Sequence, residues 1–243
     1  MIKTNQSIVI LCLCMFANLI FANQLFAKSA QALPKNIQLE YELRRGGKLI
    51  AKVKENFSQD GKQYKITSVT KGVGIYALMG ERQLQSVGEV TQEGLKPKHF
   101  ELHQGDNAKK TLINDFDWEK SSLNRTIKGE SSNVTLEKGT QDLLSYAYQF
   151  MFAPPISQND INIFLTTGKK LNAQTYRVIA RGVKLKAAKT QFKTLQIANM
   201  PEANDDKKQL WLAEDQFYLP VRYQLTDEDN ASFEQTLTKI NVE

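Results

Sequence analysis

The chain has 243 residues, of which 32 are Lys or Arg and 26 are Asp or Glu, so its formal net charge is +6. Hydrophobic residues make up 41% and charged residues 24% of the chain. This composition excludes a collagen, a low-complexity chain and a disordered tail. A chain of this length buries roughly 70% of its surface on folding, so its stability needs neither a disulfide nor a metal.

Residues 1–32 are predicted to be a cleaved secretory signal peptide. Lys3 is the first charge, and an apolar run over residues 8–21 follows it. A short basic start, an apolar stretch and small residues beyond it are typical of such a signal. The alternative is an uncleaved membrane anchor, but the run is shorter than the roughly 20 residues that span a bilayer. The exact cleavage site stays open within residues 22–32, after Ala22, Ala27 or Ala32.

Both cysteines, Cys12 and Cys14, lie in this segment. The mature chain is therefore expected to have no disulfide, no thiolate metal site and no cysteine nucleophile. Loss of Lys3 and Lys28 lowers the net charge from +6 to +4, because the segment contains no acid. No later stretch is apolar enough to span a membrane. Residues 33–243 contain no linker and no repeat, and we expect them to form a single antiparallel β domain.

The mature chain follows a period of two, which predicts β-strands. Apolar residues at positions 37, 39, 41 and 43 alternate with polar ones, and Glu55 shares its parity with the apolar Leu49, Ala51, Val53 and Phe57. Gly46-Gly47 and Asp60-Gly61 predict tight hairpins. Further strands are expected at 64–71, 82–90, 99–103, 110–118, 123–128, 161–165, 175–181, 191–198, 209–213, 221–226 and 233–242.

One apolar helix interrupts the strands. It is expected to begin at Gly139 or Thr140 and to end at Pro154-Pro155. Its side chains are apolar on nearly all sides, so it needs cover on most of its surface. The predicted fold is therefore mainly β: a single curled antiparallel sheet of about a dozen strands, a half-barrel or open barrel, wrapped around this helix.

The C-terminal third carries the most specific pattern. Leu210-Trp211-Leu212-Ala213-Glu214-Asp215 precedes Leu219-Pro220-Val221-Arg222-Tyr223-Gln224-Leu225, and a closing strand follows. Together with Ser86-Val87-Gly88, Gly94-Leu95-Lys96-Pro97 and Asp142-Leu143-Leu144-Ser145-Tyr146, it resembles the bacterial envelope family called domain of unknown function 3108. The pattern is also similar, more weakly, to the half-barrel carriers of lipoprotein localisation.

The resemblance implies a periplasmic protein with a half-barrel-like antiparallel sheet, and the family has no established activity. Its motif residues Trp211, Asp215, Pro220 and Arg222 are expected to be structural. Trp211 packs with Leu219, Asp215 occupies the turn, and Pro220 suits a strand start or an edge.

No motif predicts catalysis, so we expect a protein that is not an enzyme and that has no cofactor. His99-x-Glu101-x-His103 lies on a strand, where the histidines stand roughly 13 Å apart, too far to share one zinc. Ser68 and Lys71 have the spacing of a Ser-x-x-Lys nucleophile but face opposite sides of a strand. No phosphate loop or dinucleotide motif occurs.

Two segments are candidates for binding a hydrophobic ligand. The first, Gly72–Gly80, is apolar and bracketed by glycines; it fills the core, caps the sheet as a short helix, or acts as a lid or membrane-touching loop. The second is the helix. The candidate ligand-binding residues are Ile75, Tyr76, Leu78, Met79, Leu143, Tyr146, Ala147, Phe150 and Met151.

Three functional classes stay open: a periplasmic carrier of an acyl or lipid-like ligand, an envelope scaffold that binds a protein partner and has a filled core, and a cell-wall or glycan hydrolase. Basic residues at 177, 181, 184, 186, 189 and 193 indicate solvated strand faces or attraction to an anionic partner. Nucleic acid is not an expected partner of a secreted protein.

Overall fold

The computed structural model describes residues 32–105, 110–167, 171–201, 206–227 and 229–243. The predicted signal peptide lies almost entirely outside the described residues. Leu33–Glu243 form one compact unit. Among the described residues, no helix is long and apolar enough to cross a membrane.

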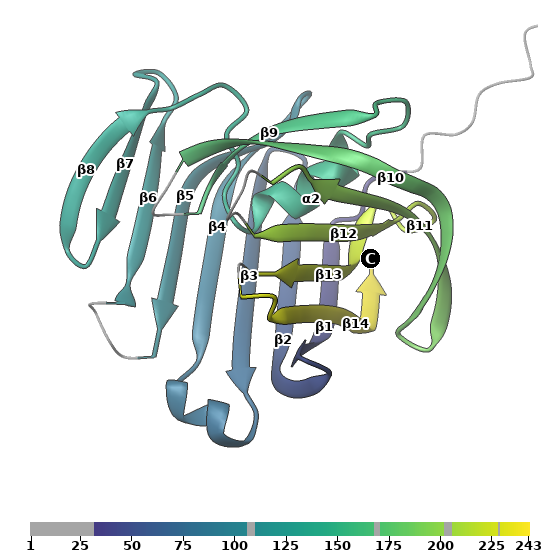
Figure 1. Ribbon diagram of the computed structural model, residues 1–243. Helices are drawn as coiled ribbons and strands as arrows, with labels where there is room; N and C mark the ends of the chain where they lie inside the picture. The colour runs from purple at the N-terminus through teal and green to yellow at the C-terminus, as the bar shows by residue number, and fades with distance from the viewer. Residues whose placement is uncertain (1–31, 106–109, 168–170, 202–205, 228) are drawn as a thin grey trace, which may run out of the picture. The chain divides into compact units, whose positions relative to one another are not determined.

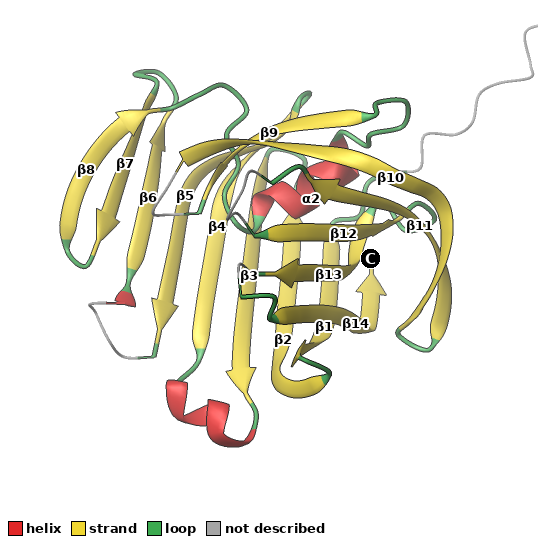
Figure 2. Ribbon diagram, in the orientation of Figure 1, coloured by secondary structure: helices red, strands yellow, loops and turns green. Residues whose placement is uncertain are grey.

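The described residues contain fourteen strands, which form one antiparallel sheet (Figure 2). The first eight are β1 (Asn36–Arg45), β2 (Lys48–Gln59), β3 (Gln63–Gly72), β4 (Arg82–Thr91), β5 (Gly94–Gln104), β6 (Leu112–Asp117), β7 (Ser122–Ile127) and β8 (Glu130–Thr135). The other six are β9 (Asp160–Thr166), β10 (Leu171–Ala187), β11 (Thr190–Asn199), β12 (Lys207–Ala213), β13 (Leu219–Thr226) and β14 (Ser232–Val242).

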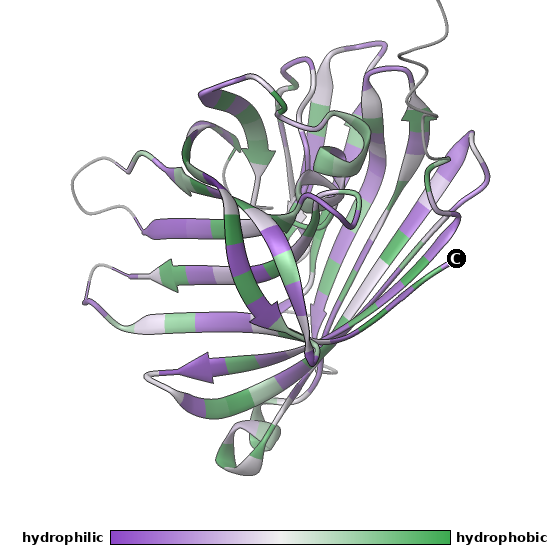
Figure 3. Cartoon of the chain, turned by 90° about the vertical axis from the view of Figure 1, so that its right-hand side faces the viewer, coloured by the Kyte–Doolittle hydropathy of each residue, from purple (hydrophilic) through white to green (hydrophobic). Residues whose placement is uncertain are grey.

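The sheet is open, with β8 and β9 as its two edges, and each half is a meander of hairpins. Strands β1 and β14 join the halves, and their pairing shifts by a bulge between Glu40 and Tyr41. Figures 1 and 3 show that the sheet curls, so that β10 to β13 run across β2 to β4 rather than beside them. The prediction of a single curled sheet is confirmed.

The sheet encloses one short helix, α2 (Ser145–Phe152) (Figure 1). Leu144, Tyr148 and Met151 pack into the larger hydrophobic cluster, and Phe150 packs into a second cluster formed with β9 to β12. The Tyr148 ring stacks on Phe57 of β2, with centroids 5.2 Å apart. The helix is therefore covered on two sides, as its apolar surface requires.

The helix begins five or six residues later than predicted. Gln141 instead pairs with β9: its backbone N–H donates to the Phe164 carbonyl, and its carbonyl accepts from the Thr166 N–H. The Asp142 carboxylate then accepts the N–H groups of Leu144 and Ser145, which have no partner within the helix, and α2 begins only at Ser145.

The Gly72–Gly80 segment forms a short 3₁₀-helix, η2 (Gly74–Met79), at the tip of the β3–β4 hairpin. Val73 donates its N–H to the Ile50 carbonyl, and Gln104 Nε2 donates to the Met79 and Gly80 carbonyls. Gly72 must be glycine, because a Cβ there would lie 2.2 Å from the Tyr76 carbonyl oxygen. Hydrogen bonds thus tie the tip to β2 and β5.

Candidate ligand-binding site

The concave side of the sheet contains a cavity of about 310 Å³ beneath α2. This volume lies at the lower end of the roughly 300–1,000 Å³ typical of ligand pockets. Both halves of the sheet and the helix contribute to the wall. Its residues are Tyr41, Val53, Glu55, Ser68, Thr70, Arg82, Leu84, Leu143, Leu144, Tyr146, Ala147, Tyr148, Leu210, Pro220, Tyr223, Leu225 and Gln235. The concave face is therefore not completely filled.

Glu55 is the most unusual group in this wall. It points inward because it has the same parity as Val53 and Phe57, which are both buried. The Tyr148 hydroxyl donates to Glu55 Oε2 at 3.2 Å, and the Ser68 hydroxyl donates to Oε1 at 3.3 Å. Its carboxyl keeps some accessible surface where it borders the cavity, but burial raises the pKa of Glu55 to about 7. The two hydrogen bonds oppose this rise, because they favour the ionised form.

The other polar groups of the wall are spread around the apolar surface. The Tyr41 hydroxyl donates to the Pro220 carbonyl at 2.9 Å and so links β1 to β13 across the fold. Burial and the nearby Glu55 both raise the pKa of Tyr41, which keeps the hydroxyl neutral. Arg82 lies at the η2 end of the wall and forms no ion pair with a described residue. The cavity is thus amphiphilic, with one carboxyl and one guanidinium among aliphatic and aromatic side chains.

The candidate ligand-binding residues of the sequence fall into three groups. Leu143, Tyr146 and Ala147 line the cavity. Phe150 and Met151 are buried in the core instead and do not line it. The four residues of η2 lie outside this cavity, and Ile75, Leu78 and Met79 are 76%, 86% and 62% exposed.

Sequence reasoning did not identify Glu55, Ser68 or Tyr148 as site residues. One signal was present for Glu55: an acid occupied the apolar parity of a strand. Ser68 and Lys71 do face opposite sides, because Ser68 is buried beside Glu55 whereas Lys71 pairs with Glu81 at the surface. The Ser-x-x-Lys spacing therefore brings no nucleophile and base together.

The four motif residues are located on β12, β13 and the turn between them. The Arg222 guanidinium lies over the Trp211 ring, 5.7 Å from its centroid, and the two residues pair across the strands. Asp215 Oδ2 accepts a hydrogen bond from the Lys193 N–H in the turn. Pro220 lies at a register shift between β12 and β13, before the β13–β14 ladder begins, so its missing N–H breaks no ladder bond.

A buried network fastens the start of α2 to the sheet. Asp142 Oδ1 accepts hydrogen bonds from the backbone N–H groups of Leu144 and Ser145, and Oδ2 accepts one from the Ser86 hydroxyl at 2.6 Å. The Tyr64 hydroxyl lies 3.0 Å from that of Ser86. Burial raises the pKa of Asp142, while these donors oppose the rise. The network sets the position of the helix that roofs the cavity.

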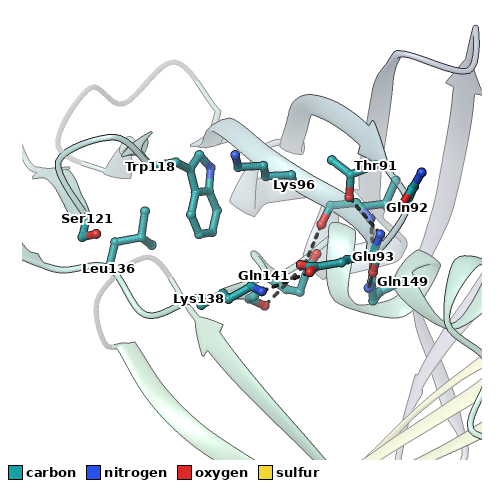
Figure 4. Close-up of a pocket in the computed structure, with 12 residues that line it drawn as sticks. Thr91, Gln92, Glu93, Lys96, Trp118, Ser121, Leu136, Lys138, Gln141 and Gln149 are labelled. Atoms are coloured by element: carbon teal, nitrogen blue, oxygen red, sulfur yellow. Dashed lines mark hydrogen bonds and ion pairs between the residues drawn. The ribbon is translucent and has the colours of Figure 1, made fainter.

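A separate pocket of about 610 Å³ lies at the β4–β5 turn (Figure 4). Gln149 of α2 uses both of its amide atoms on this turn, accepting from the Leu95 N–H and donating to the Glu93 carbonyl. Gln141 Nε2 donates to the Leu95 carbonyl. Lys96 lies over the Trp118 ring, 5.5 Å from its centroid. The amides of this pocket are largely occupied in holding the turn against the helix, so we regard the central cavity as the better candidate.

The His-x-Glu-x-His residues lie on β5, where the strand prediction is confirmed. His99 Nδ1 is 2.7 Å from Asp115 Oδ1, and His103 Nε2 is 3.1 Å from Glu101 Oε2. Within the described ranges, no three His, Cys, Asp or Glu side chains gather closely enough to hold a metal ion.

The basic residues of β10 and β11 are partly paired. Arg177 binds Asp160 and Lys193 binds Glu214, while Lys184 and Lys186 are exposed on one face of the strand.

Comparison with known proteins identifies two similar structures and one family. A Brucella abortus protein of domain of unknown function 1849, described as β-barrel-like, superposes with a TM-score of 0.60 at 13% identity, over 87% of this chain and 99% of that one. The Mycobacterium tuberculosis lipoprotein LppX aligns over 86% of this chain and 87% of its own, at 11% identity and a TM-score of 0.28. No curated protein matches the sequence. Residues 40–238 match the family described as "Protein of unknown function (DUF3108)", and the chain therefore belongs to this family.

Proposed function

We propose that this protein binds a single-chain amphiphile in the central cavity and carries it through the periplasm. The observation that carries the proposal is the composition of the cavity wall. Aliphatic side chains and aromatic rings from β1, β2, β4, α2, β12 and β13 enclose a space that also contains one carboxyl with a raised pKa. An amphiphile has the same two parts, an apolar chain and a polar group.

The apolar part of the wall supports binding of an acyl chain. Leu84, Leu143, Leu210 and Leu225 face the cavity. Moving apolar surface from water to such a wall gains roughly 25 cal/mol per Å². The size of the cavity favours one chain over a multi-chain lipid.

The polar part of the wall supports recognition of the ligand's polar group. Near pH 7 a large fraction of Glu55 is protonated, because burial raises its pKa to about 7. A neutral carboxyl both donates and accepts hydrogen bonds, so it can hold a hydroxyl, ester or carboxyl group without placing a full charge in the apolar interior.

The periplasm as compartment, and binding rather than catalysis, come from the sequence: the predicted signal peptide at residues 1–32 and the lack of a catalytic motif. They are part of the proposal.

The test is to purify the protein from its native host, extract it with organic solvent and analyse the extract by mass spectrometry, followed by titration with fluorescent fatty acids. We expect a co-purifying acyl compound and saturable binding of about one probe per protein. Absence of any acyl compound together with no fatty-acid binding would overturn the proposal.

A further inference from the structure

A second cavity adjoins the first and is lined by three basic side chains. Arg82, Lys110 and Lys128 border this space of about 360 Å³. None of the three forms an ion pair with a residue that the structure describes. Lys71 at the same end of the sheet, in contrast, has a close acidic partner in Glu81 at 2.6 Å. The positive charge of this cavity is therefore uncompensated.

The two cavities meet at Arg82, which lines both. Leu102, Leu112 and Ile127 provide an apolar wall of the second cavity, and Thr111 adds a hydroxyl. All of these residues lie at the end of the sheet that carries η2, because Arg82 pairs with Gln104 at the last position of the β4–β5 ladder. A ligand can thus extend from the apolar central cavity to the basic one.

The chemistry of the three side chains points to one kind of group. Arginine binds phosphate through two parallel N–H donors, and lysine adds compact positive charge. Arg82 is exposed where it lines the two cavities, and partial burial of its guanidinium lowers its pKa. Even so, an arginine keeps its charge in proteins. An anion that enters the basic cavity therefore meets three cations, with no carboxylate among the lining residues.

We propose that this basic cavity binds the anionic, phosphate-bearing headgroup of the amphiphile whose acyl chain occupies the central cavity. The inference rests on the proposed function and narrows the ligand to an anionic phospholipid with one chain.

The test compares ligands that share one acyl chain and differ in headgroup: lysophosphatidylglycerol, lysophosphatidylcholine, monoacylglycerol, and inorganic phosphate alone. We expect lysophosphatidylglycerol to bind at least about tenfold more tightly than monoacylglycerol, with the difference shrinking as salt rises. The double variant Lys110→Gln/Lys128→Gln changes only the basic cavity, so it should lose this preference and bind monoacylglycerol as before. The control Lys184→Gln/Lys186→Gln removes two charges from the outer face of β10 and should keep the preference.

The outcomes separate the two proposals. Equal binding of the anionic and neutral ligands would overturn the proposed headgroup site in the basic cavity but not the proposed acyl site in the central cavity. Failure of all three amphiphiles to bind would overturn the proposed function itself. Binding of inorganic phosphate as tightly as lysophosphatidylglycerol would overturn the lipid headgroup in favour of a free anion.

The exposed tip η2 carries a second, independent inference. Ile75, Leu78 and Met79 expose most of their surface although hydrogen bonds hold the tip in place. A cluster of exposed, large apolar side chains normally marks a contact surface. Figure 3 shows η2 protruding beyond the ends of the strands.

The charge around the tip argues for an anionic partner. In an antiparallel meander, alternate turns lie at the same end of the sheet, so the β1–β2, β5–β6 and β7–β8 turns flank η2. The described residues at this end include six basic side chains and two acidic ones: Arg45, Lys48, Lys71, Arg82, Lys110 and Lys128, with Glu81 and Glu130. The turns at the opposite end are more acidic, with Asp60, Lys62, Glu93, Glu119 and Lys120.

We infer that η2 inserts into the surface of a bilayer that contains anionic phospholipid. The test is sedimentation with vesicles of phosphatidylglycerol and phosphatidylethanolamine, against vesicles of phosphatidylcholine alone. Ile75→Ser/Leu78→Ser should weaken binding to the anionic vesicles by about tenfold per side chain. Ile156→Ser/Ile179→Ser removes two other exposed apolar side chains and should have no effect. Equal binding to both vesicle types, or no loss with the η2 variant, would overturn the inference.

Discussion

The Tyr148 hydroxyl donates a hydrogen bond to the Glu55 carboxyl across 93 residues of sequence, at 3.2 Å. This contact joins the helix that roofs the central cavity to the strand that forms its floor. The Tyr148 ring also stacks on Phe57, two residues beyond Glu55. The same pair of elements therefore encloses the apolar part of the cavity and positions its carboxyl.

Glu55 makes the stability of the protein depend on pH. The pKa of Glu55 in the folded protein, about 7, lies above the ordinary value of 4.5 for a glutamate. Between these values the folded state binds more protons than the unfolded state, so stability falls as pH rises through this window. Glu55→Gln removes the cost of ionisation. We expect it to stabilise the protein by about 2 kcal/mol near pH 8, since water that reaches the cavity reduces the cost of ionisation, and to have little effect near pH 4.

The measurement is urea denaturation of both proteins across this pH range. Glu130→Gln, at the exposed β7–β8 turn, is the control and should shift neither the midpoint nor its pH dependence. A constant difference between Glu55→Gln and the wild type at all pH values would contradict the account.

Tyr148→Phe should raise the pKa of Glu55 further. The Tyr148 hydroxyl stabilises the ionised form of Glu55. Without this hydroxyl, the folded protein keeps Glu55 protonated up to a higher pH. We also expect a loss of about 1 kcal/mol in stability from the missing hydrogen bond. The readout is the pH at which Glu55 titrates, followed by NMR of a labelled carboxyl. Tyr76→Phe, on η2, should leave it unchanged, and a fall in the Glu55 pKa of Tyr148→Phe would be inconsistent with the geometry.

Asp142 should matter more than a similar aspartate at the surface. Asp142 and Asp60 each accept two backbone N–H bonds, but only Asp142 is buried and bound to Ser86. Asp142→Ala leaves those buried donors without partners and should cost about 2–4 kcal/mol, clearly more than Asp60→Ala, whose donors can bind water instead. Equal losses in thermal or urea unfolding would show that the buried network contributes little.

Gly94 should be intolerant of a side chain. Its φ is +109°, and a Cβ there would lie 2.4 Å from the Gln149 amide. Gly129 also has a positive φ, +87°, but open space around it. We expect Gly94→Ala to be at least about 1 kcal/mol more destabilising than Gly129→Ala, because a clash adds to the backbone strain. The extra destabilisation by Gly94→Ala should shrink when Gln149 is also replaced by alanine. If it does not shrink, another contact causes it.

The alternation of apolar residues was enough to predict the sheet, because each strand buries one face. It did not predict β8, Glu130–Thr135, whose side chains are almost all exposed and so have no apolar face to reveal it. The start of α2 was misplaced because Gln141 bonds to β9, a strand that follows it in sequence.

The site was only partly predictable. Leu143, Tyr146 and Ala147 could be identified from the apolar helix, but periodicity does not distinguish them from Phe150 and Met151, which fill the core. Glu55 could be seen only as an acid at an inward position. Its partners Ser68 and Tyr148 depend on how distant segments meet, which local sequence does not encode.

The measurement that tests the central claim most directly is titration of a fluorescent fatty acid into Ala147→Trp. Ala147 lines the cavity, so an indole there should fill much of its volume. Ala153→Trp is the matched control, because Ala153 is exposed just beyond the same helix. Thermal unfolding of both variants checks that each is folded. The account predicts at least about a tenfold loss of affinity in folded Ala147→Trp and none in Ala153→Trp; unchanged affinity in folded Ala147→Trp would contradict it.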